Sequence, residues 1–325
     1  MITQLFQKHY QLSVSSDVTS KFEEKIISYR HYLMQMRNLV QSTIEAYCLV
    51  ACRFLIYFYK NKNDNPTHLE NLTSQDVENF ICDIGKQIGR RTLFNRITAL
   101  RTFLRYLVVT QEISTNLDRQ IDTPRIYGEE QLPRALDWKI VSIFLQSIDR
   151  TTDYGKRDYA MLFLIATYGL RASEVVNIKL EDIEWRECRL RIFQRKTSTS
   201  LLLPLIDPVA NCLIEYLRNG RPTTSVREIF VKHQFLHGPL KPIVVSNVFN
   251  KWSQCSNLSI PFHGPHCLRH SLAVHLLRQG TPLKTIGDLL GHKNFSSTCI
   301  YLRLNIEDLN TVPLNIPFSL SIQGV

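Results

Sequence analysis

A long succession of helical hydrophobic patterns, with no strand signal between them, is the feature that most limits how this chain can fold. Between residues 21 and 110, apolar residues recur at helical spacing, and Asn, Asp, Pro and Gly mark the gaps. The pattern predicts helices at 21–39, 42–61, 74–84 and 90–109. Ser42 and Ser74 are candidate N-caps, and Ser42 with Glu45 matches a capping box. The sequence therefore predicts a helical first domain, 21–111, after an N-terminal extension, 1–20.

The last predicted helix of this domain has one apolar side and one basic side. Its stripe consists of Leu93, Ile97, Leu100, Leu104 and Leu107. The arginines lie mostly off the stripe: Arg90, Arg91, Arg96, Arg101 and Arg105. The whole chain carries 39 Lys and Arg against 29 Asp and Glu, a formal charge of +10, which favours a polyanionic partner such as nucleic acid. A basic face that contacts DNA and a basic face that only promotes solubility both remain open at this point.

The helical pattern fades between residues 112 and 133, which predicts a linker before a second domain, 134–325. Two apolar segments, 188–193 and 200–205, flank a polar turn and predict a short antiparallel hairpin. Helical patterns surround this hairpin at 137–146, 157–168, 173–178, 208–218, 245–254, 266–279, 282–290 and 297–304. The expected fold class is mainly α with a small antiparallel β element.

The sequence offers little sign of a membrane or of secretion. The longest apolar stretches, 54–59 and 160–170, are shorter than the roughly 18 residues that span a bilayer. The first 17 residues lack the layout of a signal peptide, and the eight cysteines include no CxxC pair, so we expect reduced thiols. These features predict a cytoplasmic protein with no membrane partner.

Four segments of the second domain hold an unusual set of chemical groups. They are TYGLRASE at 167–174, RK at 195–196 in the hairpin turn, HCLRH at 266–270, and LLGH at 289–292, which Tyr301 follows nine residues after the histidine. In order and spacing these segments resemble the tyrosine recombinase (phage integrase) family, and the resemblance covers the whole second domain. It implies a helical core-binding domain followed by a mixed α/β catalytic domain.

The resemblance implies that Tyr301 is the nucleophile and that Arg171 and Arg269 bind the phosphate. Attack on a phosphodiester moves negative charge onto its non-bridging oxygens, and fixed cations stabilise that charge. A guanidinium stays protonated and donates two parallel hydrogen bonds, which a lysine cannot do. A covalent link through Tyr301 conserves the phosphodiester energy for rejoining.

The resemblance also assigns the proton transfers. Lys196 would protonate the leaving 5′ oxygen, and a lysine among concentrated positive charge has a lowered pKa that suits this role. His266 would accept the proton of Tyr301 and bind phosphate, and His292 would donate a further hydrogen bond. Glu174 would orient the arginines without contacting DNA.

Each of these residues also has an ordinary structural explanation. Arg171 could form a salt bridge with Glu174, Arg269 could lie on the surface, and Lys196 could be a polar turn residue. Tyr301 could be a packed core residue, and the histidines could be structural. The hairpin turn is more polar and less basic than is common in the family, and Cys267 stands where a polar or acidic residue is frequent.

A zinc site is the alternative that a cluster of histidines and cysteines suggests. The candidate ligands are Cys255, His263, His266, Cys267 and His270. They lack the paired, regular spacing of zinc sites, so we expect neither a metal ion nor another cofactor.

The resemblance implies a site-specific recombinase or integrase that acts through a 3′-phosphotyrosine and a Holliday junction, without metal or ATP. Its partners would be double-stranded recombination sites, with a homodimer on each site, a homotetramer in the synaptic complex, and accessory proteins in some systems. The apolar segment 302–325 would pack on a neighbouring subunit or on its own domain. Two other functions stay open: a DNA-binding regulator without catalysis, and a topoisomerase, against which the small N-terminal domain counts.

Overall fold

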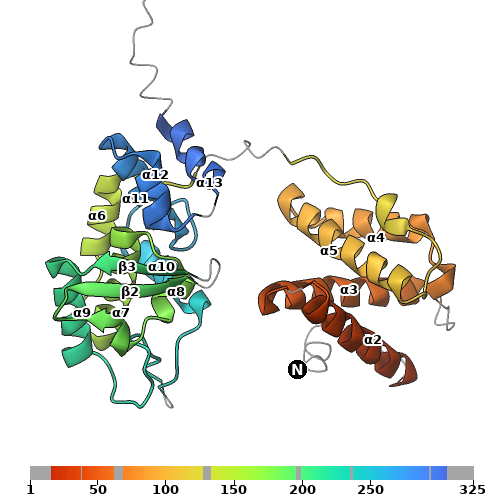
Figure 1. The fold of residues 1–325 in the computed structure, drawn as a ribbon, viewed down its shortest axis with the longest axis horizontal. Helices are drawn as coiled ribbons and strands as arrows, with labels where there is room; N and C mark the ends of the chain where they lie inside the picture. Colours follow the sequence, from red (N-terminus) through yellow and green to blue (C-terminus); the bar gives the residue numbers. More distant parts are fainter. Residues whose placement is uncertain are drawn as a thin grey trace, which may run out of the picture. The chain divides into compact units, whose positions relative to one another are not determined.

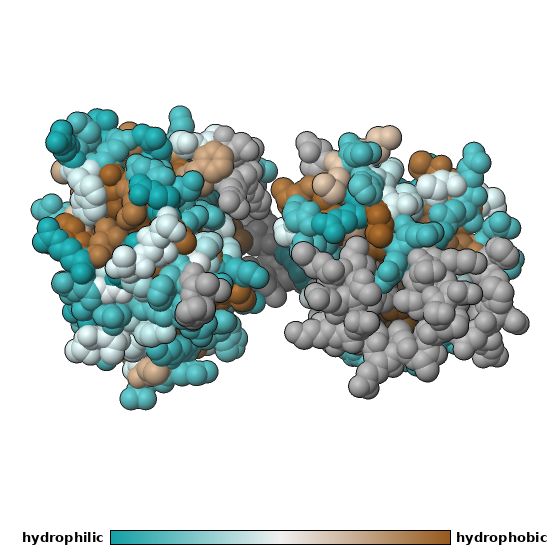
Figure 2. All heavy atoms as spheres, turned by 90° about the horizontal axis from the view of Figure 1, so that it is seen from below, coloured by the Kyte–Doolittle hydropathy of each residue, from teal (hydrophilic) through white to brown (hydrophobic). Residues whose placement is uncertain are grey.

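The computed structural model describes residues 16–37, 39–61, 69–126, 133–194, 199–234, 237–292 and 294–305. The chain forms two compact units, residues 1–130 and 131–325. Each unit has its own hydrophobic core. Among the described residues that Figure 2 shows, hydrophilic side chains cover most of the surface and apolar ones form smaller areas.

The first unit is a helical bundle, as predicted (Figure 1). Its elements are α2 (Ser16–Gln35), α3 (Gln41–Asn61), η1 (Leu69–Asn71), α4 (Ser74–Gly85), α5 (Arg90–Val109) and η2 (Leu117–Arg119). Two predicted caps are wrong by one residue. Helix α3 begins at Gln41, whose side chain donates to Glu45 over 2.9 Å, so Ser42 lies inside the first turn. Thr73, not Ser74, caps α4, in a reciprocal capping box with Asp76.

The core of the first unit joins α2, α3 and α5 through aromatic side chains. Tyr29 of α2 packs edge-on against Phe103 of α5 at 5.0 Å between ring centroids, and Phe54 of α3 also contacts Phe103. Among the described residues, α3 is the one helix long and apolar enough to cross a membrane. Eight of its residues are buried, and they lie in this core, which accounts for its hydropathy.

The first part of the predicted linker packs on the first unit. Ile113, Leu117 and Ile121 are buried in its core. The Arg105 guanidinium donates to the Asp118 carboxylate over 2.6 Å, and Arg101 donates to the carbonyl of Ile121. The segment that follows α5 is therefore fastened to it by both apolar and charged contacts.

The second unit packs helices against one face of a small sheet, and the other face of the sheet is exposed (Figure 1). Its strands are β1 (Ile183–Glu184), β2 (Arg189–Gln194) and β3 (Thr199–Pro204), in the order β1-β2-β3 and antiparallel throughout. The predicted hairpin is confirmed, with Leu190 opposite Leu203, and β1 adds a short strand that the sequence did not predict. The remaining elements are α6 (Trp138–Gln146), α7 (Asp153–Tyr168), α8 (Ala172–Val176), η3 (Leu180–Asp182), α9 (Asp207–Asn219), α10 (Pro242–Cys255), α11 (His266–Arg278), α12 (Leu283–Leu290), α13 (Ser296–Cys299) and η4 (Ile300–Asn305).

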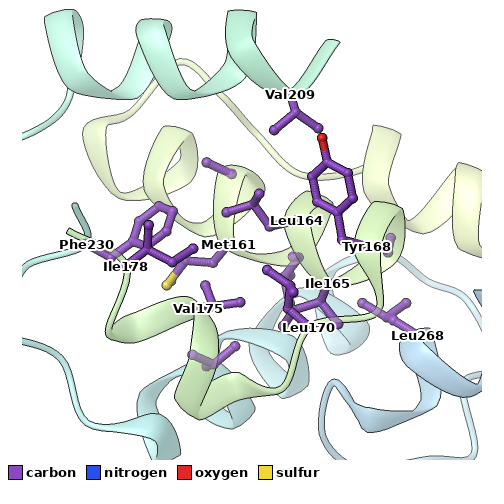
Figure 3. Packing of buried hydrophobic residues seen from close by; sticks show 14 of the residues in the cluster. Met161, Leu164, Ile165, Tyr168, Leu170, Val175, Ile178, Val209, Phe230 and Leu268 are labelled. Carbon is purple, nitrogen blue, oxygen red and sulfur yellow. The ribbon is translucent and has the colours of Figure 1, made fainter. Parts of the chain in front are cut away.

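Helix α7 is the central element of the second unit. Its residues Met161, Leu164 and Ile165 are buried, and they pack with side chains from α8, α9 and α11 (Figure 3). A helix that is apolar on most of its surface belongs in a core rather than at an edge. At the end of α7, the Tyr168 hydroxyl donates to the carbonyl of Pro204 over 2.6 Å. This bond fixes the helix end against strand β3, directly before the first predicted site residues.

Candidate active site

The first arginine of the site is held by the chain that follows α7. Gly169 ends this helix with φ +65°, and a Cβ there would lie 2.5 Å from a methyl carbon of Leu290, so only glycine fits. Arg171 then caps α8, and its backbone N–H donates to the Glu174 carboxylate over 2.8 Å. The Arg171 guanidinium donates to the other carboxylate oxygen over 2.6 Å. Buried Glu174 therefore contacts both the backbone and the side chain of Arg171.

The second arginine, Arg269 of α11, is almost completely buried, with 2% of its surface exposed. Its guanidinium donates to the carbonyl of Gly169 and, over 2.5 Å, to the carbonyl of Leu290. These carbonyls lie at the C-terminal ends of α7 and α12, where helix dipoles favour a cation. Burial and the neighbouring Arg171 lower the pKa of Arg269 to about 10, so it stays protonated at neutral pH.

Gly291 and His292 bring a third segment to the arginines. Gly291 ends α12 with φ +62°, and its carbonyl accepts from Arg171 over 3.4 Å. A Cβ at Gly291 would lie 2.2 Å from the side-chain amide of Gln194, the last residue of β2. The end of the hairpin strand therefore packs directly on the site. His292 Nδ1 lies 2.9 Å from the Thr298 hydroxyl, which fixes the imidazole orientation.

Tyr301 lies on η4 with 1% of its surface exposed. It packs in a small cluster with Ala273, Val274, Ile286 and Leu290. Burial raises the pKa of the Tyr301 hydroxyl, whereas the positive charges of Arg269 and Arg171 lower it. The predicted helix at 297–304 is instead a short α-turn, α13, followed by the 3₁₀ turns of η4.

The histidine beside the Tyr301 hydroxyl is His270, where the sequence predicted His266. Nδ1 of His270 lies 3.0 Å from Tyr301 Oη. His266 is the first residue of α11 and is exposed, with its ring centroid 4.6 Å from that of His270. The two histidines are four residues apart and so share one face of α11. The second predicted box holds the signal for this contact, because it contains both histidines.

Most of the predicted site residues come together. The contacts above join Arg171, Glu174, Arg269 and Tyr301, and the ring of His292 lies 6.4 Å from that of Tyr301 between centroids. Lys196 lies outside the described residues. Cys267 is buried and its thiol contacts the carbonyl of Gly264, so this unusual residue faces the protein interior.

The zinc alternative gains no support from the part of the chain that the structure describes. There, no group of three His, Cys, Asp or Glu side chains is arranged to hold a metal ion.

The five arginines of α5 separate into two groups. Arg90 and Arg91 are exposed at the start of the helix, and Arg96 is half-buried. Arg101 and Arg105 instead fasten the segment after α5, through Ile121 and Asp118. These two arginines therefore have a role in the fold, although the Arg105 side chain is still 55% exposed. Contact of the five arginines with DNA stays a prediction.

Comparisons with known sequences match both units. The model of the phage integrase family matches residues 139–308, and that of the phage integrase N-terminal SAM-like domain matches residues 26–111. A putative integrase/recombinase y4rA of Sinorhizobium fredii is 31% identical over 92% of this chain and 72% of its own length. The tyrosine recombinase XerD of Listeria innocua is 30% identical over 87% of this chain and 96% of its own length.

Solved structures share the fold. The XerH recombinase in a post-cleavage complex with palindromic difH substrate has a TM-score of 0.68 at 18% identity, over 94% of this chain and 90% of that one. A lambda integrase tetramer bound to a Holliday junction has a TM-score of 0.63 at 19% identity, over 91% of this chain and 85% of that one. Together with the family match over more than half of its residues, these findings show that the chain belongs to the phage integrase family of tyrosine recombinases, enzymes that cleave and rejoin DNA.

Proposed function

We propose that this protein is a site-specific recombinase that cleaves DNA with Tyr301, forms a 3′-phosphotyrosine, and exchanges strands through a Holliday junction. The observation that carries the proposal is the position of the Tyr301 hydroxyl. This hydroxyl is buried in a site where the charges of Arg269 and Arg171 lower its pKa. Nδ1 of His270 lies 3.0 Å from the hydroxyl oxygen. A tyrosine packed only for stability needs no such surroundings.

The arginines stabilise the charge that develops during cleavage. Arg171 and Arg269 are positioned before DNA arrives, one by Glu174 and the other by two helix ends. Fixed cations of this kind lower the barrier because they need no reorganisation during the reaction. His266 and His292 donate hydrogen bonds to phosphate oxygens, and Lys196, two residues after Gln194, protonates the leaving 5′ oxygen.

The reaction needs neither ATP nor a metal ion. In cleavage, a phosphorus–oxygen bond to Tyr301 replaces the bond to the 5′ oxygen, so the number of phosphoester bonds is unchanged. The 5′ hydroxyl of another strand then displaces the tyrosine. The two arginines supply the positive charge that a metal ion supplies in other phosphoryl-transfer enzymes.

We also propose an assembly in which two subunits bind each double-stranded recombination site and two sites join in a tetramer in the cytoplasm. The lambda integrase tetramer on a Holliday junction supports this arrangement through its shared fold. The excess of 10 positive charges suits a DNA partner. Accessory proteins are compatible with this scheme, as is a role in a mobile element.

The test is a trapping assay in EDTA with nicked genomic DNA fragments and the purified full chain. A nick beside the cleavage point lets the cut strand end diffuse away, so the covalent adduct accumulates. The wild-type protein should give an adduct on a denaturing gel, and Tyr301→Phe should give none while its DNA binding persists, because only the attacking oxygen is lost.

A matched control is Tyr216→Phe. Tyr216 is another buried tyrosine of the same unit, and its hydroxyl lies 3.5 Å from His233. This variant should form the adduct normally. An undiminished adduct in Tyr301→Phe would refute the proposed nucleophile. Salt-sensitive binding without any adduct would favour a non-catalytic DNA-binding protein, and relaxation of plasmids without a defined site would favour a topoisomerase.

A further inference from the structure

His270 is the group in contact with the hydroxyl that attacks DNA. Its Nδ1 lies 3.0 Å from Tyr301 Oη, and the ring planes are inclined by 58° at 5.6 Å between centroids. This distance is within hydrogen-bond reach, the geometric requirement for a general base. The contact exists before DNA binds, so the hydroxyl and its neighbour are already oriented.

The other two histidines are placed for different tasks. Nδ1 of His292 faces the Thr298 hydroxyl at 2.9 Å, and its ring lies nearly parallel to that of Tyr301. His266 is exposed at the start of α11, with its ring edge-on to His270. A phosphate bound near the arginines would meet the exposed His266 more readily than the half-buried His270. This placement favours phosphate binding by His266 and leaves His270 beside the Tyr301 hydroxyl.

Burial, together with the charged groups around it, keeps the His270 imidazole neutral. The groups that act on it are His266, Arg269, His292 and Arg134, and each opposes a further positive charge there. Burial and these groups lower the pKa of His270 to about 4. At neutral pH the imidazole is therefore uncharged, and its Nδ1 can accept a hydrogen bond while Nε2 carries the proton. A DNA phosphate would bring negative charge to the same place and make a protonated His270 more favourable.

We propose that His270 is the catalytic residue that accepts the proton of Tyr301 during strand cleavage, an inference that rests on the proposed function. The O–H bond of Tyr301 breaks, and its proton passes to Nδ1 of His270. An oxygen electron pair forms the bond to phosphorus, and the electrons of the broken phosphorus–oxygen bond leave with the 5′ oxygen, which Lys196 protonates. In rejoining, the imidazolium returns the proton to Tyr301 as the tyrosine leaves.

Two variants at position 270 separate proton transfer from positioning. In His270→Asn, the amide oxygen stands close to the place of Nδ1 and keeps a hydrogen bond to Tyr301, but it takes up no proton. In His270→Ala both functions are lost. The matched control is His275→Asn on the same helix, where the histidine stacks on Trp138 at 4.3 Å outside the site. Circular dichroism checks that each variant is folded.

The substrates also separate the two proton transfers. Nicked duplexes recovered from the wild-type trapping assay are resynthesised with oxygen or with sulfur as the bridging 5′ atom. A thiolate leaves without protonation, so the sulfur substrate bypasses Lys196 and retains the need to deprotonate Tyr301. The sulfur substrate should therefore rescue Lys196→Ala but not His270→Asn.

Single-turnover cleavage over a pH series gives the decisive readout. The wild-type rate should change much less with pH than that of the variant at neutral pH and above, since the pKa of His270 in the free protein, about 4, leaves room for DNA phosphate to raise it while the base stays mostly neutral. His270→Asn should cleave about 10²- to 10⁴-fold more slowly at pH 7 with either substrate. Its rate should rise about tenfold per pH unit, because tyrosinate must form by loss of its proton to solvent before attack.

Three outcomes would overturn the inference. Cleavage by His270→Asn at the wild-type rate with a flat pH profile would remove the base role and leave the proposed function intact. An active Asn variant beside an inactive Ala variant would show that His270 only positions Tyr301. If the wild-type protein forms no Tyr301 adduct with any DNA, the proposed function itself fails, and the inference fails with it.

Discussion

Arg171 depends on Glu174 for its position, because this carboxylate contacts both its backbone and its guanidinium. Glu174→Gln keeps the shape of the side chain and removes its charge. We expect strand cleavage to fall roughly 10- to 100-fold, because Arg171 then has only a neutral partner and samples other orientations. DNA affinity should change little, since the charge that binds phosphate remains. Trapping rates and equilibrium binding, measured on the same preparation, check this prediction.

A surface carboxylate provides the control for this variant. Glu181 pairs with Arg227 over 3.2 Å, and its side chain is 50% exposed. Glu181→Gln should leave cleavage unchanged, because exposed ion pairs contribute little. Equal losses in the two variants would contradict the positioning role of Glu174.

The sequence predicted Arg171, Glu174, Arg269, His292 and Tyr301 as site residues, and the structure brings them together. It did not predict the contact of His270 with Tyr301. The two histidines of α11 lie one turn apart on the same face, so helical spacing alone does not choose between them. The choice depends on how η4 packs against α11, and such a long-range contact leaves no local pattern in the sequence.

At the scale of elements, α5 has exposed arginines at its start, which we expect to contact DNA, and arginines further along that hold the following segment. Arg91→Ala should weaken DNA binding, because one phosphate contact is lost. For the same reason, the slope of the logarithm of the binding constant against the logarithm of the salt concentration should become less steep by about one. Arg105→Ala should instead lower the free energy of unfolding by about 1–3 kcal/mol, because buried Asp118 loses a charged hydrogen-bond donor. Fluorescence anisotropy over a salt series and urea denaturation measure the two effects. A reduced salt slope in Arg105→Ala alone would reverse the assignment.

The helices and the hairpin could be predicted because their periodic patterns are long, whereas their ends could not. Thr73 and Ser74 are both good N-caps, and the reciprocal bonds of Thr73 with Asp76 decide between them. Strand β1 has only two residues, too few for an alternating pattern, and it exists through its pairing with β2. The end of the 297–304 helix pattern tightens into a 3₁₀ turn where Tyr301 enters the core, which periodicity does not indicate.

At the scale of the whole molecule, we expect the proposed assembly to depend on a segment beyond the core of the second unit. The segment 302–325, predicted to pack either on a neighbouring subunit or on its own domain, lies almost entirely outside the described residues. Its sequence is rich in apolar residues, among them Leu309, Val312, Leu314 and Ile316. A chain that stops after Leu304 should bind a single DNA site and form the Tyr301 adduct, but should fail to join two sites. Native gel shifts with one-site and two-site DNA measure both steps, and unchanged recombination would show that the tail packs on its own unit.

Arg269 joins the ends of α7 and α12 through the carbonyls of Gly169 and Leu290. Natural selection for folding alone would therefore retain this arginine after strand cleavage had ceased to matter, since its loss leaves two buried helix ends without a donor. Tyr301 is different, because a phenylalanine fills the same apolar cluster without the hydroxyl. In a related protein that has lost activity, we therefore expect the hydroxyl at position 301 to be lost first. Its arginines would still be those of an active enzyme.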